Sequence, residues 1–231
     1  MRSLVTGIDA KVLYTALIAW FFKGKVAGAS CADLGCGKAF TPLALSKVCR
    51  VVYAYDIDEA VCAMYRGHAR VKPVCEDVEE VEVLGDGHLT LVLALNILEH
   101  LSNPLKALRK ICSSMDRGGY LVVSVPSPSI ECRGAFKCDS THKWLLPREK
   151  WIKMGVVVGF VYNEEVNERF ISLVKHHLIK ALPRSFGHLY RASAQYPYSG
   201  RVSGYLGAVV GLMTRRTVVN PCSELLVFKK P

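Results

Sequence analysis

The sequence lacks any long hydrophobic run. No apolar stretch reaches the roughly 18–20 residues that cross a bilayer, so no transmembrane segment is expected. The apolar stretch from Lys11 to Phe22 is shorter, and it lacks the basic start and small-residue cleavage site of a signal peptide. We expect it to form a helix within residues 1–28 that covers the rest of the fold.

Paired cysteine motifs are also missing. The nine cysteines include no C-x-x-C pair, and the spacing of Cys132, Cys138 and His142 matches no common zinc pattern, so no metal site is expected. An odd cysteine number without a signal peptide predicts a reducing, cytoplasmic location. Five cysteines lie in or beside apolar segments, where a free thiol packs as a small hydrophobe: Cys31, Cys49, Cys62, Cys75 and Cys112.

Acidic side chains are scarce in the second half of the chain. Residues 131–231 hold 16 Lys/Arg and 7 Asp/Glu, a balance of +9, whereas residues 1–130 hold 14 and 13, a balance of +1. Such a surplus is explained by solubility alone. It also suits a surface that meets phosphate, nucleic acid or a membrane.

The sequence does contain a regular alternation of apolar strand-length segments and helical patterns. Alternation of this kind builds a parallel sheet through right-handed crossovers. We therefore expect an α/β fold with a doubly wound, mostly parallel sheet. The predicted strands are Ala29–Asp33, Val51–Tyr55, Val71–Cys75, Thr90–Leu95 and Tyr120–Val125, and the predicted helices are Thr41–Cys49, Glu59–Arg70 and Pro104–Met115.

The alternation is less regular beyond Pro128. We expect a helix over Pro147–Met154, a strand over Gly155–Tyr162, a helix over Asn163–Ala181 and a last strand over Glu224–Lys229. Residues 163–222 are too many for a hairpin loop. They are expected to form a lid or substrate-binding insertion before the last strand, within a single domain of residues 1–231.

The most informative segment is residues 29–37, Ala-Ser-Cys-Ala-Asp-Leu-Gly-Cys-Gly. A strand that ends at Asp33 and turns through Gly35 and Gly37 into a helix lets the backbone approach a ligand closely. This predicts a cofactor that contains adenosine. The dinucleotide fingerprint is incomplete, because position 40 is Phe where a third glycine is needed. Asp33 would also repel a pyrophosphate.

Polar side chains follow the neighbouring predicted strands. Asp56 is placed to hold a pair of ribose hydroxyls, and Asp77 to accept a hydrogen bond from an adenine amino group. Asn96 lies in the segment Leu95–Leu101, which comes at the end of the fourth strand. In a doubly wound sheet, these strand ends border the binding crevice.

Taken in order over residues 29–126, these motifs resemble the class I S-adenosylmethionine-dependent methyltransferases, in particular the small-molecule group of ubiquinone-biosynthesis O-methyltransferases. Their seven-stranded fold is therefore expected. Lys38 and Ala39 depart from the family pattern of a small polar residue and Gly. The matching segments are Asp33–Gly37, Tyr55–Asp58, Glu76-Asp77, Leu98–Leu101 with Pro104 and Leu108, and Gly118–Tyr120 before Pro126; His142, Pro147–Glu149 and Gly159-Phe160 match more weakly.

The resemblance implies an S-adenosylmethionine site and assigns residues to its parts. The methionine part would lie along Asp33, Gly35, Cys36 and Gly37, with Asn96 beside the transferring methyl group. The ribose would bind at Asp56, next to Ile57, and the adenine at Asp77 and Val78.

The resemblance further implies methyl transfer to an oxygen or nitrogen of a small-molecule or lipid-like acceptor. His100 and His142 are the candidate general bases. Two alternatives stay open: an RNA methyltransferase that uses the basic and aromatic residues 183–201, and a non-catalytic module of the same fold. Glu99 and His100 can equally be explained as the cap of a helix.

Overall fold

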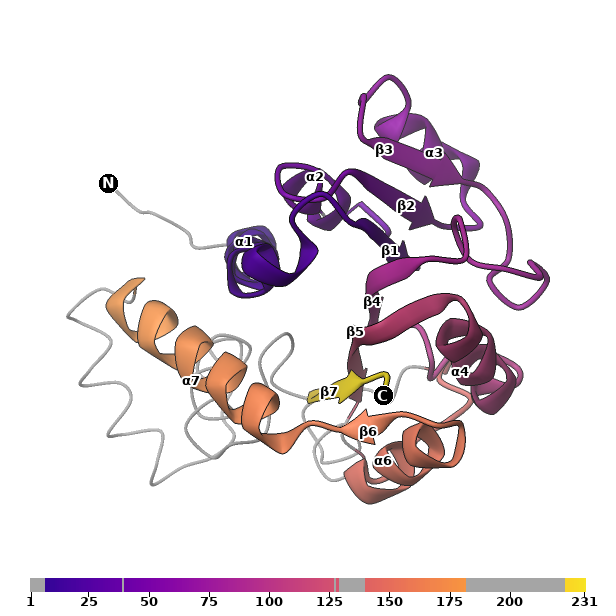
Figure 1. Cartoon of the computed structure of the whole chain (residues 1–231), viewed down its shortest axis with the longest axis vertical. Coiled ribbons are helices and arrows are strands. Elements are labelled where there is room, and N and C mark those ends of the chain that lie inside the picture. Colours follow the sequence, from indigo (N-terminus) through magenta and orange to yellow (C-terminus); the bar gives the residue numbers. More distant parts are fainter. Residues whose placement is uncertain (1–6, 39, 127, 129–139, 182–222) are drawn as a thin grey trace.

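The structure is a computed structural model that describes residues 7–38, 40–126, 128, 140–181 and 223–231. Its strands are β1 (Ser30–Leu34), β2 (Val51–Tyr55), β3 (Val71–Val74), β4 (Leu89–Leu95), β5 (Met115–Pro126), β6 (Val161–Tyr162) and β7 (Ser223–Lys229). They form one sheet in the order β3-β2-β1-β4-β5-β7-β6 (Figure 1). Strands β1 to β5 are parallel, and β7 is antiparallel to both of its neighbours. The predicted mostly parallel α/β fold is confirmed.

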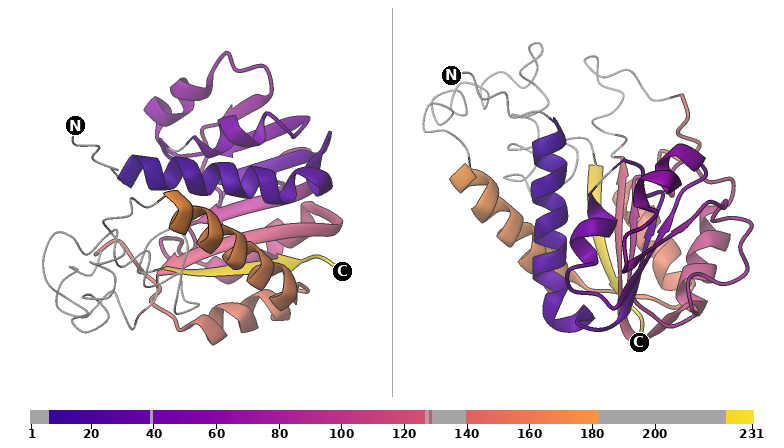
Figure 2. Two further views of the ribbon diagram at one scale, coloured as in Figure 1. Left: turned by 90° about the vertical axis from the view of Figure 1, so that its left-hand side faces the viewer. Right: turned by 90° about the horizontal axis from the view of Figure 1, so that it is seen from above.

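Helices cover both faces of this sheet (Figure 2). On one face, α1 (Gly7–Val26), α2 (Thr41–Leu45) and α7 (Glu164–Ala181) pack against β1, β4, β5 and β7. On the other face lie α4 (Pro104–Ser113) and α6 (Arg148–Val157). A third, smaller core joins α3 (Glu59–Tyr65) to β2 and β3. Because both faces are covered, the central strands are apolar along nearly their whole length.

The sequence also determines where two of these helices begin. Asp58 caps α3 by accepting a hydrogen bond from the backbone N–H of Ala60, and Asn103 caps α4 by accepting one from Lys106. Pro104 follows Asn103 in the first turn of α4, where its missing N–H has no cost. Helix α3 ends at Tyr65, earlier than predicted, and Gly67 then turns the chain at φ +83°.

One predicted strand is wrong. Residues 155–157, expected within the strand Gly155–Tyr162, are the last turn of α6, and β6 contains only Val161 and Tyr162. The reason is the approach of α6 to β7 at Gly155: a Cβ atom there would lie 2.4 Å from Cε1 of Phe228. The close packing that this glycine permits stabilises the helix through a valine-rich run that reads as a strand in isolation.

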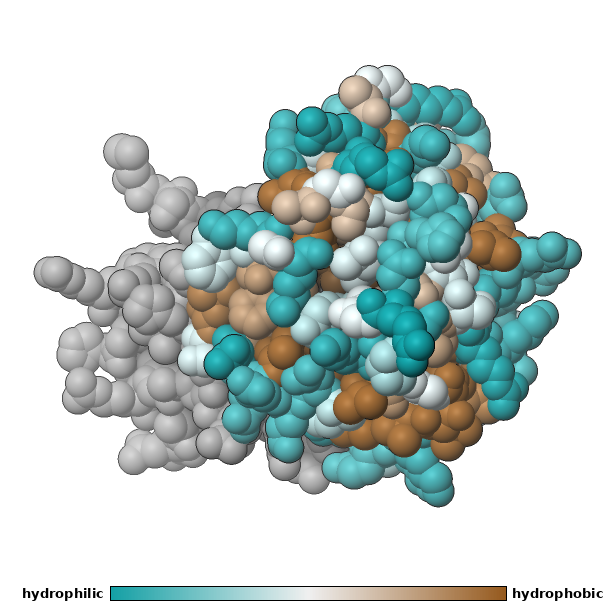
Figure 3. Space-filling model, in the orientation of Figure 1, coloured by the Kyte–Doolittle hydropathy of each residue, from teal (hydrophilic) through white to brown (hydrophobic). Residues whose placement is uncertain are grey.

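The surface over α6 and β6 is unusually apolar. Val156, Val157 and Val161 are each more than half exposed there, and Figure 3 shows a hydrophobic area over these elements. No helix in the described parts of the chain has the length and apolar character of a membrane-spanning segment. Most of the predicted insertion, residues 163–222, lies outside the described residues; its first part is α7.

Candidate functional site

The polar residues predicted to bind a cofactor meet at one edge of the sheet. Asp77, Asp56 and Asn96 follow the carboxyl ends of β3, β2 and β4, and Asp33 is the penultimate residue of β1. These four strands are neighbours in the sheet, with β1 paired to both β2 and β4. The strand order therefore reverses at β1, which is where open α/β sheets bind ligands.

The turn after β1 has a geometry that requires glycine. Gly35 and Gly37 have φ angles of +64° and +53°, in the left-handed region that favours glycine. A Cβ atom on Gly35 would lie only 2.8 Å from Cδ1 of Ile97. Between them, Cys36 is buried and donates its backbone N–H to the carbonyl of Tyr55. Lys38, the departure from the family pattern, is exposed to solvent.

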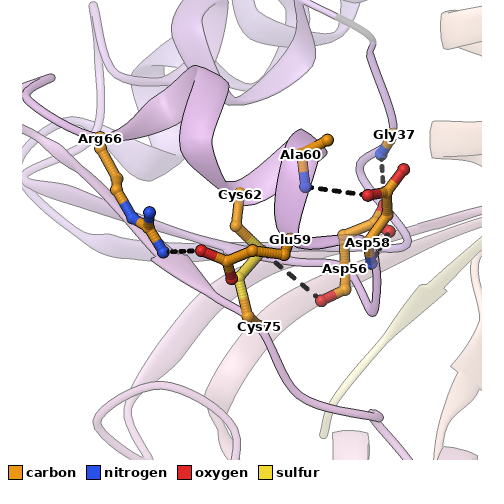
Figure 4. The surroundings of a disulfide bond; sticks show 8 residues. All are labelled: Gly37, Asp56, Asp58, Glu59, Ala60, Cys62, Arg66 and Cys75. Atoms are coloured by element: carbon orange, nitrogen blue, oxygen red, sulfur yellow. Dashed lines mark hydrogen bonds and ion pairs between the residues drawn. A yellow bond between two sulfur atoms is a disulfide. The ribbon is translucent and has the colours of Figure 1, made fainter.

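Asp56 holds this turn in place (Figure 4). Its Oδ2 atom accepts a 2.8 Å hydrogen bond from the N–H of Gly37, and its Oδ1 atom accepts one of 3.0 Å from the N–H of Asp58. From α3, the hydroxyl of Tyr65 donates to the Gly37 carbonyl at 2.8 Å. The neighbouring Ile57 is 78% exposed, as expected of a side chain at an open edge.

The loop after β3 is fixed to the start of α4. Asp77 is exposed and accepts a 2.8 Å hydrogen bond from the N–H of Glu79, while Val78 is buried. The Glu79 carboxylate in turn accepts from the N–H groups of Ser102 and Asn103, both at 2.8 Å. Asp77 and Val78 are therefore held at the same edge as Asp56.

Asp33 is a strongly perturbed carboxyl group at this edge. It is 2% exposed. Burial raises its pKa to about 8, and the nearby charge of Asp56 adds to the effect. The Asp33 carboxyl is therefore mostly protonated at neutral pH, and a cation beside it would favour the charged form.

Asn96 has a fixed side-chain orientation at the end of β4. Its φ of 55° is in the left-handed region, which asparagine tolerates better than most residues. Its Nδ2 atom donates to Oε1 of Glu99, and its Oδ1 atom accepts from the hydroxyl of Ser124, each at 3.1 Å. The amide is thus oriented from both sides at the switch point of the sheet.

The two histidines proposed as bases lie together next to Asn96. The ring centroids of His100 and His142 are 4.7 Å apart, although the residues are far apart in the sequence. Glu99 completes the cluster and is fully buried. Because the cap of α4 is Asn103, Glu99 and His100 do not cap that helix. Sequence reasoning left Glu99 out of the predicted site residues, and its burial was the missing information.

A disulfide supports the Asp56 side of the edge. Cys62 on α3 is bonded to Cys75, which follows β3, and the two Cα atoms are 6.0 Å apart. The Cys62 sulfur also lies 3.6 Å from the carbonyl oxygen of Asp56 (Figure 4). The prediction of free thiols is therefore wrong for these two cysteines, and the inference of a reducing compartment loses part of its basis. No motif links the two positions; only the folded chain brings them together.

Replacing both Cys62 and Cys75 with serine is expected to lower the free energy of unfolding by about 3 kcal/mol. The bond joins residues 13 positions apart and so reduces the conformational entropy of the unfolded chain. Chemical denaturation of the oxidised protein and the double variant measures the difference. Mass spectrometry of a non-reduced digest should recover the peptide that links the two cysteines. If only free thiols are recovered from the oxidised protein, the pairing is refuted.

Comparison with known proteins fits this architecture. Residues 32–123 match a family model described as a methyltransferase domain. This matched segment is a methyltransferase domain, and its family is that of the class I S-adenosylmethionine-dependent methyltransferases. The methyltransferase domain so matched begins in β1 and ends in β5, so it contains Asp33, Asp56, Asp77 and Asn96. The subgroup of ubiquinone-biosynthesis enzymes is not distinguished by this match.

Solved structures share the methyltransferase fold at low identity. The candidate methyltransferase bound to the Trm112 methyltransferase activator of Haloferax volcanii has a TM-score of 0.65 at 15% identity, over 97% of this chain and 92% of that one. An S-adenosylmethionine dependent methyltransferase from Mesorhizobium loti has a TM-score of 0.51 at 18% identity, over 61% and 77%. The 4+2 cyclase SpnF has a TM-score of 0.55 at 19% identity, over 94% and 81%. No curated protein sequence matches the chain.

Proposed function

We propose that this protein binds S-adenosylmethionine at the edge formed by β3, β2, β1 and β4 and transfers its methyl group to an oxygen or nitrogen of an acceptor. The observation that carries the proposal is the convergence of Asp33, Asp56, Asp77 and Asn96 at this edge, next to the glycine turn. Asp56 would hold the ribose, with Ile57 beside it, and Asp77 and Val78 the adenine. The methionine part would lie along Asp33 and the Gly35–Gly37 backbone.

Charge favours this cofactor over a dinucleotide. S-adenosylmethionine carries a sulfonium and an ammonium group, and both are attracted by the carboxylate that Asp33 forms on losing its proton. A pyrophosphate at the same turn would keep that carboxyl protonated and meet the charge of Asp56. Because the bound sulfonium supplies an activated methyl group, the protein has chiefly to align an acceptor and exclude water.

Methyl transfer from S-adenosylmethionine needs no further reactant besides the acceptor. The acceptor lone pair forms a bond to the methyl carbon while the carbon–sulfur bond breaks, and its electrons neutralise the sulfonium. The acceptor proton must leave to a base or to water. His100 and His142 lie near Asn96, which we place beside the methyl group, and they are the candidates for this step.

We propose a small-molecule or lipid-like acceptor in the cytoplasm as the first assignment. The charge balance of +9 in residues 131–231 supports RNA as the second candidate. The third candidate is a non-catalytic module of this fold, which binds no cofactor or binds it without turnover. The similar fold of a cyclase supports it, because the same fold is then not tied to methyl transfer.

Isotope-labelled methyl transfer tests the assignment. Purified protein is incubated with methyl-labelled S-adenosylmethionine and either a metabolite and lipid extract or total RNA, and the labelled product is identified by mass spectrometry. Label in an organic-soluble product supports the first candidate. Label in RNA that is lost steeply with added salt supports the second. Cofactor binding without label in either fraction contradicts methyl transfer.

Once the acceptor is known, His100→Ala and His142→Ala should each be assayed. Loss of the group that removes the acceptor proton is expected to lower kcat by about 100-fold or more. His88→Ala is the matched control, because this exposed histidine pairs with Asp116 away from the edge. Full kcat in both variants would exclude a histidine role in the transfer.

A further inference from the structure

Glu99, His100 and His142 form a compact group of metal-ligating side chains. Each offers one ligand atom, and these three atoms all lie within 4.8 Å of one another. Ligands around one first-row transition metal lie about 3–3.5 Å apart, given bond lengths of about 2.0–2.2 Å. Small rotations of the three side chains would therefore bring them to a shared ion.

The backbone holds the three residues together without help from a ligand. The carbonyl of Glu99 accepts hydrogen bonds from the N–H groups of Lys143 at 2.8 Å and Trp144 at 3.1 Å. The indole N–H of Trp144 donates to the carbonyl of Leu101 at 2.8 Å. These three bonds dock the segment that carries His142 onto the turn that carries Glu99 and His100.

Hydrogen bonds also orient two of the ligands. Nδ1 of His100 lies 3.2 Å from the carbonyl oxygen of Thr141. The hydroxyl of Thr141 lies 3.1 Å from the same Nδ1 atom. Both contacts with Thr141 thus use Nδ1, and a ring that donates from Nδ1 to the carbonyl presents the lone pair of Nε2 to an ion. An imidazole held in this way is the usual arrangement of a metal-ligating histidine. On Glu99, Oε1 accepts from Nδ2 of Asn96 at 3.1 Å, which fixes the plane of the carboxylate.

We propose that Glu99, His100 and His142 bind one divalent transition-metal cation. Two imidazoles and one carboxylate suit Zn²⁺, Fe²⁺, Co²⁺ or Mn²⁺ better than Mg²⁺ or Ca²⁺, which prefer oxygen ligands. Three protein ligands leave coordination positions for other molecules, as in catalytic rather than structural metal sites. The short motifs by which zinc sites are found in sequences do not include this combination, so the sequence predicted no metal.

The position of the site gives the cation a role, and this part rests on the proposed function. Asn96 bonds directly to Glu99 and stands where we place the transferring methyl group. A cation here can bind the acceptor oxygen or nitrogen, lower the pKa of its proton and orient its lone pair. The proton then leaves to water, and no histidine has to act as a base.

Co²⁺ titration of the oxidised, metal-free full-length protein tests the site without cofactor or acceptor. Visible absorption of bound Co²⁺ and calorimetry should both give one equivalent per chain. His100→Ala and His142→Ala should each weaken Co²⁺ binding by at least about 10-fold. Two controls should bind as the wild type does: His88→Ala, and Cys132→Ser with Cys138→Ser, which tests a cysteine site near His142.

Three results would overturn the proposal: no Co²⁺ binding, binding that both histidine variants retain, or binding that the cysteine variant loses. S-adenosylmethionine binding is measured separately on the same metal-free protein. Intact cofactor affinity without Co²⁺ binding refutes the metal site alone. Co²⁺ binding without cofactor affinity refutes the proposed function and leaves the metal site standing. Thermal unfolding of each variant verifies that it is folded.

Discussion

Replacing Asp56 with asparagine is expected to weaken S-adenosylmethionine binding by about 10- to 100-fold. A hydrogen bond to a charged group contributes about 1.5–3 kcal/mol, and we propose that the Asp56 carboxylate accepts from the ribose hydroxyls. The same carboxylate holds the N–H of Gly37 at 2.8 Å, so its loss also loosens the turn along the methionine part. Calorimetric titration of both proteins gives the ratio of dissociation constants.

Asp58→Asn is the matched control for this measurement. Asp58 is two residues away and caps α3, but it has no assigned contact with the cofactor. The control variant should keep the wild-type affinity. The assignment of the ribose site fails if Asp56→Asn binds as tightly as the wild type. It also fails if the two variants lose affinity equally, because the effect would then come from α3 rather than from the ribose.

Replacing Asp33 with asparagine is expected to change how stability depends on pH. The pKa of this carboxyl is 3.8 in the unfolded chain and about 8 in the fold. The folded protein therefore binds one proton that the unfolded chain releases. Its stabilising contribution is fully present below about pH 4 and is lost as the pH rises toward 8, a difference of about 6 kcal/mol.

Urea unfolding of the cofactor-free protein at several pH values between 5 and 8 measures this effect. The wild type should lose stability as the pH rises, by roughly 1.4 kcal/mol per unit at most from this group. Asp33→Asn should remove that slope and be the more stable protein at pH 8. Glu149→Gln, a change at an exposed carboxylate, should keep the wild-type slope. An unchanged slope in Asp33→Asn would refute the buried, protonated state.

Burial favours the protonated form of Asp33, whereas a cation bound beside it would favour the carboxylate. The burial of this carboxyl group is therefore costly in the cofactor-free protein, and the positive charge of the proposed cofactor would offset the cost. The proposed cofactor would account for a carboxyl group in the buried strand β1, between Ala54 and Leu93 of the neighbouring strands.

The strands and the cofactor edge were predictable because local signals determine them. Buried parallel strands are continuously apolar, and the residues that follow them, such as Asp56 and Asp77, necessarily share one edge of the sheet. Helix α6 was cut short in the prediction because a valine run favours a strand locally. Only its contact with Phe228 through Gly155 reveals the helix.

The remaining features depend on contacts between distant parts of the chain. Nothing local indicates that His142 packs against His100, or that the backbone of Glu99 binds the segment after residue 140. The disulfide between Cys62 and Cys75 is hidden for the same reason, because α3 and the end of β3 meet only in the fold. Neither the disulfide nor the group around His142 and His100 has the residue spacing of a known sequence motif.

Hydrogen–deuterium exchange with and without S-adenosylmethionine tests the central claim most directly. We expect the cofactor to slow amide exchange in residues 33–38, 56–58, 76–79 and 95–100, which come from four separate strand ends. NAD at the same concentration should leave these segments unchanged. Protection confined to other parts of the chain would contradict the account. So would the absence of any protection at millimolar S-adenosylmethionine.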